Sequence, residues 1–368
     1  MVPAQTLATC LRPRPSAAPA PPLDPSLSSH LRDQGIGPLL RRAMRERGVL
    51  DAQPSAIRDE LARLAREEAL IEPFRRDETE RTLDALAAAG VPAIVFKGTA
   101  LAYACYPDPS LRPRLDTDLL VRRQDVDAAS RVFERLGCTR TLRTSGELVT
   151  HQFTYVSTRH GLSLAFDVHW KIADPQPFAD LFSFDELDRD AKPLPGLGPH
   201  ARTLSTEHAL LVACTHRVAH HYDREVVIDL CDIDLLAAAL EGPAWARVAK
   251  LAVEKRIRRV VARGLQLASE RLGTVIPVGV LETLTAKDPA DAEPTAAYLT
   301  AGFRKVDILA GDLRELRWPD RLRLVREHLF PPPAFVLKSF GRTQPILLPV
   351  LYAVRIARGA AAWFRQIR

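Results

Sequence analysis

The feature that most constrains the fold lies between residues 91 and 121, where two short apolar runs flank a proline-containing loop. The first run, residues 91–96, is typical of a buried strand, and a second strand is predicted over residues 116–121. Side chains alternate along a strand, so Asp116 and Asp118 would point to the same face. Two neighbouring carboxylates repel each other unless a cation lies between them. The pattern therefore favours a divalent metal site.

The segment Lys97-Gly98-Thr99 follows the first strand directly. Thr99 is predicted to cap a helix over residues 100–105. Backbone amides at a helix N-terminus attract anions, so Gly98 and the amides after it are the natural place for phosphates.

A third carboxylate follows on a later strand. Residues 151–157 and 162–170 alternate in polarity on either side of a break at 159–161, which predicts a hairpin. In the second strand Asp167 and His169 share one face. A two-metal site needs several carboxylate oxygens, and Asp167 would add a third carboxylate to those of Asp116 and Asp118. The alternative is that Asp167 lines a solvated strand face.

Composition sets the outer limits. The 368 residues suggest two domains with extensions, and the apolar fraction of 46% is that of a globular protein. The net charge of +6 fits an anionic substrate such as a nucleotide. Nucleic acid is not expected as a partner, because the chain contains no basic stripe with interleaved aromatics. Five cysteines without a CxxC motif fit a reducing cytoplasm and argue against a disulfide framework or a structural zinc.

The order of patterns along the chain predicts four segments. Residues 1–33 are rich in proline and are expected to be a disordered tail. Residues 34–76 would form N-terminal helices, one of them capped by Ser55, and residues 77–200 would hold the catalytic domain. From 201 to 368 helical periodicity dominates, and Ser205 or Thr206 can cap its first helix. The fold class expected is α+β, with a small mixed-sheet core and a helical C-terminal domain.

Four histidines gather in the first helix of the C-terminal domain and just after it. His216 and His220 are four residues apart and share a helical face. Position 217 is arginine, so the HExxH signature of a zinc protease is absent. We expect these histidines to line the substrate cleft or its packed wall.

The C-terminal stretch, residues 345–364, contains an apolar run that ends at Arg355, too short to span a bilayer. A docked amphipathic helix is the favoured interpretation. The alternative is a basic helix resting on a membrane surface.

Four segments together, KGTALAYACYPDPSLRPRLDTDLLV, FDVHWKI, the histidine-rich helix and VIDLCDIDLL, resemble a bacterial family of uncharacterised nucleotidyltransferases. That family belongs to the DNA polymerase beta-like nucleotidyltransferase superfamily. The resemblance runs from about residue 78 to about residue 340. It implies a mixed-sheet catalytic core, a helical C-terminal domain, an NTP site and magnesium, with two ions expected.

The resemblance also implies roles for individual residues. Thr99 supplies the hydroxyl where the superfamily usually has a serine after the glycine. The residues implied in nucleotide binding are Lys97, Gly98, Thr99 and Arg112. Those implied in metal binding and catalysis are Asp116, Asp118 and Asp167. Those expected in the acceptor cleft are His169, His216 and Asp232.

The function expected is transfer of an NMP group from an NTP, with ATP favoured, to a small-molecule or protein acceptor, with release of pyrophosphate. Two alternatives stay open. One is a glycosyltransferase that uses its DxD pair to bind a nucleotide sugar. The other is a non-catalytic, nucleotide-binding partner module that retains the fold.

Overall fold

A mixed sheet lies at the centre of the protein. The structure is a computed structural model that describes residues 3–11, 23–141, 148–286, 293–299 and 305–367. Within these residues seven strands form the sheet, in the order β3-β4-β5-β2-β1-β7-β6. The strands are β1 (Ala93–Phe96), β2 (Asp116–Val121), β3 (Thr139–Arg140), β4 (Gln152–Arg159), β5 (Leu162–His169), β6 (Lys192–Pro193) and β7 (Arg202–Thr203).

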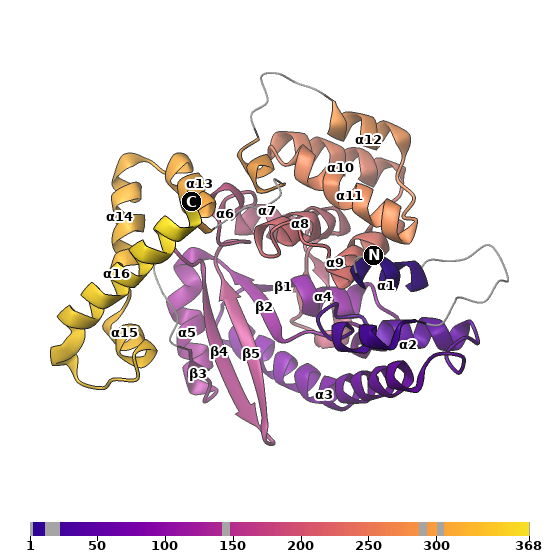
Figure 1. The fold of residues 1–368 in the computed structure, drawn as a ribbon, viewed down its shortest axis with the longest axis horizontal. Helices are drawn as coiled ribbons and strands as arrows, with labels where there is room; N and C mark the ends of the chain where they lie inside the picture. The colour runs from indigo at the N-terminus through magenta and orange to yellow at the C-terminus, as the bar shows by residue number, and fades with distance from the viewer. Residues whose placement is uncertain (1–2, 12–22, 142–147, 287–292, 300–304, 368) are drawn as a thin grey trace.

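Helices surround this sheet in three groups (Figure 1). The N-terminal and sheet-flanking helices are α1 (Pro3–Leu11), α2 (Gly37–Glu46), α3 (Ser55–Ala88), α4 (Lys97–Ala104), α5 (Val126–Arg135), α6 (Gln176–Ala179) and α7 (Phe184–Arg189). A helical layer follows, with α8 (Thr206–Ala219), α9 (Val227–Ala238), α10 (Gly242–Glu254), α11 (Arg258–Leu272) and α12 (Val278–Thr285). A C-terminal arm comprises α13 (Lys305–Glu315), α14 (Trp318–Leu329), α15 (Pro333–Ser339) and α16 (Leu348–Ile367). The expected α+β class with a helical C-terminal region is confirmed.

The period of two along the central strands separates the two faces of the sheet. Ile94 and Phe96 of β1 are buried against the α8–α12 layer, together with Leu120. Val95 and Leu119 point the other way and are buried in a second core with residues of α3 and α5. The first core joins residues of the predicted catalytic and C-terminal segments, so these two segments are packed as one body.

The strands that the sequence predicts around the carboxylates are confirmed. β2 covers residues 116–121 as expected, and β4 and β5 pair as an antiparallel hairpin. β2 runs parallel to β5 and antiparallel to β1. Ser205 caps α8 by accepting a hydrogen bond from the backbone N–H of His208, as the sequence predicts.

The helix predicted to begin at Ser55 continues beyond the segment 34–76 to which the sequence assigned it. Residues 55–88 form one 34-residue helix, α3, with Pro73 inside it. Pro54 rather than Ser55 occupies the N-cap position. The boundary expected at 76/77 therefore falls in the middle of a helix, because packing of its later turns onto the sheet outweighs the local effect of one proline.

The expectation of a disordered N-terminal tail is wrong for the part of it that the structure describes. Residues 3–11 form α1, and Pro25–His30 forms a 3₁₀ helix. Leu7 and Leu31 are fully buried in a core that includes Leu267 of α11. Proline composition alone did not reveal this apolar contact. Residues 12–22 of the tail lie outside the described part.

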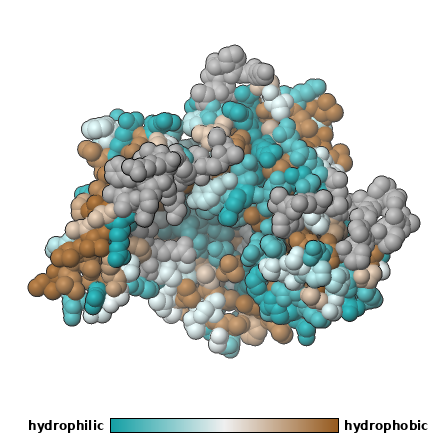
Figure 2. Space-filling model, viewed as in Figure 1, coloured by the Kyte–Doolittle hydropathy of each residue, from teal (hydrophilic) through white to brown (hydrophobic). Residues whose placement is uncertain are grey.

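The end of the C-terminal arm presents apolar side chains to solvent. Ile346 is 86% exposed and Val350 is 61% exposed, and an apolar surface is visible over this part of the arm in Figure 2. Arg355 of α16 donates a hydrogen bond to the carbonyl oxygen of His328, which ties α16 to α14. Among the described residues, no helix has the length and apolarity that a membrane crossing requires.

We expect Leu7→Ala to destabilise the protein by about 2–5 kcal/mol, since it empties a fully buried site in α1. Leu70→Ala, at a position of α3 that is 72% exposed, serves as the control and should change stability by less than about 0.5 kcal/mol. Urea unfolding followed by circular dichroism measures both. Equal stability of the two variants would show that α1 is not packed in solution.

Candidate functional site

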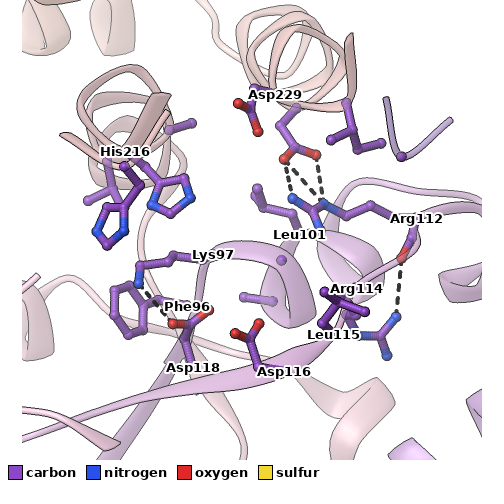
Figure 3. A pocket seen from close by; sticks show the side chains of 18 of the residues that line it. Phe96, Lys97, Leu101, Arg112, Arg114, Leu115, Asp116, Asp118, His216 and Asp229 are labelled. Carbon is purple, nitrogen blue, oxygen red and sulfur yellow. Dashed lines mark hydrogen bonds and ion pairs between the residues drawn. The ribbon is translucent and has the colours of Figure 1, made fainter. Parts of the chain in front are cut away.

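The sheet register brings the predicted acidic residues together. Asp118 of β2 lies directly beside Asp167 of β5. His169 follows two residues later on the same face of β5. One ligand atom from each of these three residues lies within 4.8 Å of the other two, a spacing that fits a metal ion. Asp116 lies on the same strand, two residues before Asp118, at the open side of the cleft (Figure 3).

Lys97 supplies the positive charge that these carboxylates need. Its Nζ donates a hydrogen bond of 2.8 Å to Oδ1 of Asp118 and lies 3.4 Å from Nε2 of His169. Nε2 of His169 in turn lies 2.8 Å from the same Asp118 oxygen. Lys97 has a φ of 53°, in the left-handed region that non-glycine residues rarely adopt. Such strain is typical of a functional position.

The charges of this cluster shift the pKa values of its members in opposite directions. Burial raises the pKa of Asp118, but Lys97 and His169 together hold it well below its ordinary value. Desolvation in the cleft, with the charges of Asp118 and Asp167 nearby, raises the pKa of Asp116 from 3.8 to about 7. Asp116 is thus the carboxylate whose charge is least favourable in the metal-free cleft.

Asp167 is held from the neighbouring strand. Thr154 Oγ1 donates to Oδ1 of Asp167, and Gln152 Nε2 donates to its Oδ2, each at 2.5 Å. Thr154 lies opposite Asp167 in the hairpin register, and Gln152 lies opposite His169. The sequence interpretation missed these two residues. The sequence does contain a signal for them, because Gln152 and Thr154 alternate along β4 in register with the acidic face of β5.

Arg112 and Asp232, predicted for different roles, form one buried ion pair. Nε of Arg112 donates to Oδ1 of Asp232 at 2.9 Å, and Nη2 donates to Oδ2 at 2.6 Å. The hydroxyl of Tyr106 donates to the same carboxylate at 2.7 Å. A Cβ added to Gly98 would lie 2.5 Å from Nη1 of Arg112, so only glycine allows the turn and the ion pair to approach this closely.

Thr99 is placed differently from its prediction. The helix begins at Lys97, three residues earlier than expected, with Phe96 at the N-cap position and no side-chain cap. Thr99 is buried, and its hydroxyl bonds to the backbone oxygen of Asp116 and lies 3.2 Å from the hydroxyl of Thr117. Thr117 points away from the carboxylate face, so Thr99 supports β2 from behind instead of lining the cleft. The cap prediction is wrong because a tertiary contact takes the hydroxyl.

The opposite wall of the cleft is formed by α8 and α9. His216 lines it, and its ring stacks on that of His220 at 4.5 Å between centroids. Burial lowers the pKa values of both histidines, so both are neutral at pH 7. His221 is paired with Asp229 of α9. Within the described residues, the histidines of this wall do not converge as a metal-binding group.

The cleft enclosed by these walls has a volume of about 560 Å³, within the size range of small-molecule sites. Figure 3 shows the carboxylates of β2 below, Lys97 beside them, and His216 and Asp229 on the helices across the opening. Asp33 and Gly35 from the N-terminal region also line it. The sequence interpretation did not include these two, because the N-terminal region was expected to be partly disordered.

Residues 25–273 match a family model described as uncharacterised nucleotidyltransferase, and this match covers more than half of the chain. The chain therefore belongs to this nucleotidyltransferase family, as its motifs predict. No curated protein matches the chain. The crystal structure of JHP933 from Helicobacter pylori is similar over 69% of this chain and 98% of that chain, with 12% identity and a TM-score of 0.33. An identity and a TM-score this low give no information about the site.

We expect Asp116→Asn to stabilise the metal-free protein at pH 8. Because the folded pKa of Asp116 lies near 7, above its ordinary 3.8, its contribution to stability is present below pH 3.8 and is lost as the pH rises through 7. The neutral amide escapes this loss, so the Tm of the variant should exceed that of wild type at pH 8 in EDTA and match it at pH 4.

Asp127→Asn, at an exposed position of α5, is the control and should leave the Tm unchanged at both pH values. Thermal unfolding followed by circular dichroism measures the difference. An Asp116→Asn variant no more stable than wild type at pH 8 would show that the carboxylates do not repel each other as described.

Proposed function

We propose that this protein is a magnesium-dependent nucleotidyltransferase that moves an NMP group from an NTP, with ATP favoured, to a small-molecule or protein acceptor. Pyrophosphate is the second product. The observation that carries the proposal is the convergence of Asp118 and Asp167 on neighbouring strands, with Lys97 bonded to Asp118. Asp116 lies beside them on β2 and Gly98 follows Lys97. The chain that holds this group belongs to a nucleotidyltransferase family.

The chemistry of the donor atoms fits magnesium. Magnesium prefers carboxylate oxygens and phosphate oxygens, and Asp116, Asp118 and Asp167 present carboxylates on one face of the sheet. The pKa of Asp116 is raised first by desolvation in the cleft and then by the negative charges of Asp118 and Asp167, both of which a bound cation would offset. We assign two ions to these three residues. When bound, they would neutralise phosphate charge and lower the pKa of the attacking hydroxyl.

Lys97 and Gly98 are assigned to the triphosphate. Lys97 and Gly98, at the N-terminus of α4, line the cleft, and a helix N-terminus favours anions. Lys97 donates a hydrogen bond to Asp118, one of the carboxylates that would hold the metal. Its flexible side chain would also allow it to contact phosphate oxygens bound at the turn. Arg112 is held by its ion pair with Asp232. We therefore assign Arg112 to positioning the Lys97-Gly98 turn and to adding positive charge near it.

Asp167 is assigned as the proton acceptor. Gln152 and Thr154 fix its orientation, which is what a group that must meet a hydroxyl in a defined geometry requires. The acceptor oxygen forms a bond to the α-phosphorus, its proton passes to Asp167, and the bond to pyrophosphate breaks. We assign His169, His216 and Asp232 to the surroundings of the acceptor.

The place of this reaction is proposed to be the cytoplasm, and the support is the set of five free cysteines. Contact of α16 with a membrane surface stays a prediction. Its support is the exposed apolar side chains of Ile346 and Val350, in an arm whose sequence also contains basic residues.

We expect Asp118→Asn and Asp167→Asn to lower pyrophosphate release by about a thousandfold or more, since loss of a metal-binding charge removes several kcal/mol of transition-state stabilisation. The assay supplies each of the four NTPs with magnesium and a cell extract as the source of acceptor. Asp127→Asn, an exposed carboxylate outside the cleft, is the matched control and should retain full activity.

Full activity of both cleft variants would refute the proposal. Nucleotide binding without pyrophosphate release in wild type would favour the non-catalytic binding module. Turnover of a nucleotide sugar in place of an NTP would favour the glycosyltransferase.

We expect metal affinity to rise with pH up to about 7. Asp116 must lose its proton to bind an ion, and its pKa lies at about 7, so each pH unit below that value should weaken binding by up to about tenfold. Titration calorimetry with Mn²⁺ between pH 5.5 and 8 measures this slope. In Asp116→Asn the dependence of Mn²⁺ affinity on pH should be weaker. An unchanged dependence would show that another group releases the proton.

A further inference from the structure

A second cavity, of about 410 Å³, lies away from the cleft, between the sheet and the C-terminal arm. It is lined by aromatic side chains and arginines from both sides. It falls within the size range of small-molecule sites. We call it the arginine–aromatic groove.

The wall on the sheet side combines two rings with two guanidinium groups. The rings of Phe153 and Trp170 contact each other at 4.9 Å between centroids. The guanidinium of Arg140 lies 3.6 Å above the ring of Phe153, and that of Arg123 lies 5.4 Å from the ring of Trp170. Both rings pack against the core on the α3 and α5 side of the sheet, opposite the carboxylate face. The groove is therefore distinct from the nucleotidyltransferase cleft.

The wall on the arm side repeats this combination. Phe330, at the end of α14, is 55% exposed, and its ring lies 5.7 Å from that of Tyr352 of α16. Arg323 and Arg326 reach the groove from α14. The acidic residue among those lining the groove is Glu327, whose carboxylate already accepts hydrogen bonds from Arg323 and from the backbone N–H of Leu148. The groove has an excess of positive charge.

We propose that the arginine–aromatic groove binds a nucleobase together with its phosphate, from a free nucleotide or from a single-stranded nucleic acid. Exposed aromatic faces stack on bases without regard to sequence, and arginine fits phosphate oxygens with two parallel hydrogen bonds. Arginine also stacks on aromatic rings, as Arg140 does on Phe153, so the same side chains hold the rings in place.

The groove was not expected from the sequence, where nucleic acid was set aside for lack of a basic stripe with interleaved aromatics. Its residues are spread from 123 to 352 and come together only in the folded chain. The proposal does not depend on the reaction in the cleft, because none of the groove residues lines the cleft.

The test is fluorescence anisotropy with a labelled single-stranded DNA decamer of mixed sequence, in EDTA so that metal-dependent binding in the cleft is absent. We expect Arg326→Ala and Phe330→Leu each to weaken binding by about tenfold, through loss of a phosphate contact and of a stacking surface. Both positions are exposed, so neither substitution should disturb folding. The salt dependence of binding should also be shallower in Arg326→Ala.

Arg342→Ala removes an exposed arginine of the same arm that does not line the groove, and it should bind the decamer like wild type. Competition by AMP at concentrations close to that of the decamer nucleotides assigns the groove to free nucleotides, and failure of AMP to compete assigns it to nucleic acid. Absence of decamer and AMP binding, or binding that both groove substitutions leave unchanged, would overturn the proposal.

Discussion

The structure of the cleft depends on repulsion among carboxylates that one lysine relieves only in part. Unit charges a few ångströms apart interact by several kcal/mol in a partly desolvated site. Lys97 and His169 both bond to Asp118, so that carboxylate is fully charged. Asp116 is desolvated in the cleft and lies near the charges of Asp118 and Asp167, so its pKa rises. The turn after β1 must place an ammonium group over β2, and the strained backbone of Lys97 is the local result.

This arrangement works only if the sheet keeps its register. Phe96 lies opposite Asp118 in the β1–β2 pair, and both face the α8–α12 layer, whereas Val95 and Leu119 face α3 and α5. A slip of one residue in β2 would turn Asp118 into the apolar core behind the sheet and bring Leu119 into the cleft. The two hydrophobic cores therefore specify the position of the carboxylate face as strongly as the acidic residues do.

The parts of this molecule that the sequence predicted well are those fixed by local patterns. The alternation of β2, the hairpin of β4 and β5 and the cap of α8 each depend on residues close together in the chain. The errors have long-range causes. Thr99 carries a cap signal, but its hydroxyl is taken by contacts with β2, and α1 is ordered by a surface some 260 residues away in sequence, at Leu267.

The pairing of Arg112 with Asp232 could not be predicted either, because 120 residues separate the two. The sequence assigned them separately to nucleotide and acceptor, but their contact joins the α9 helix to the turn at Gly98. A buried ion pair adds little to stability, yet breaking it leaves an unpaired buried charge, so it defines one geometry strictly. Here it sets the distance between the helical wall and the turn at Gly98.

Strand β5 shows how one short element can serve two surfaces. Asp167 and His169 face the cleft, while Val168 and the following Trp170 pack toward the other core, where Trp170 becomes part of the arginine–aromatic groove. Because successive side chains of a strand point to opposite faces, residues next to the carboxylates of β5 must face the other side of the sheet. A ligand held in the groove would thus touch the residue adjacent to His169, so the two surfaces are joined by a single peptide bond although they lie on opposite sides of the sheet.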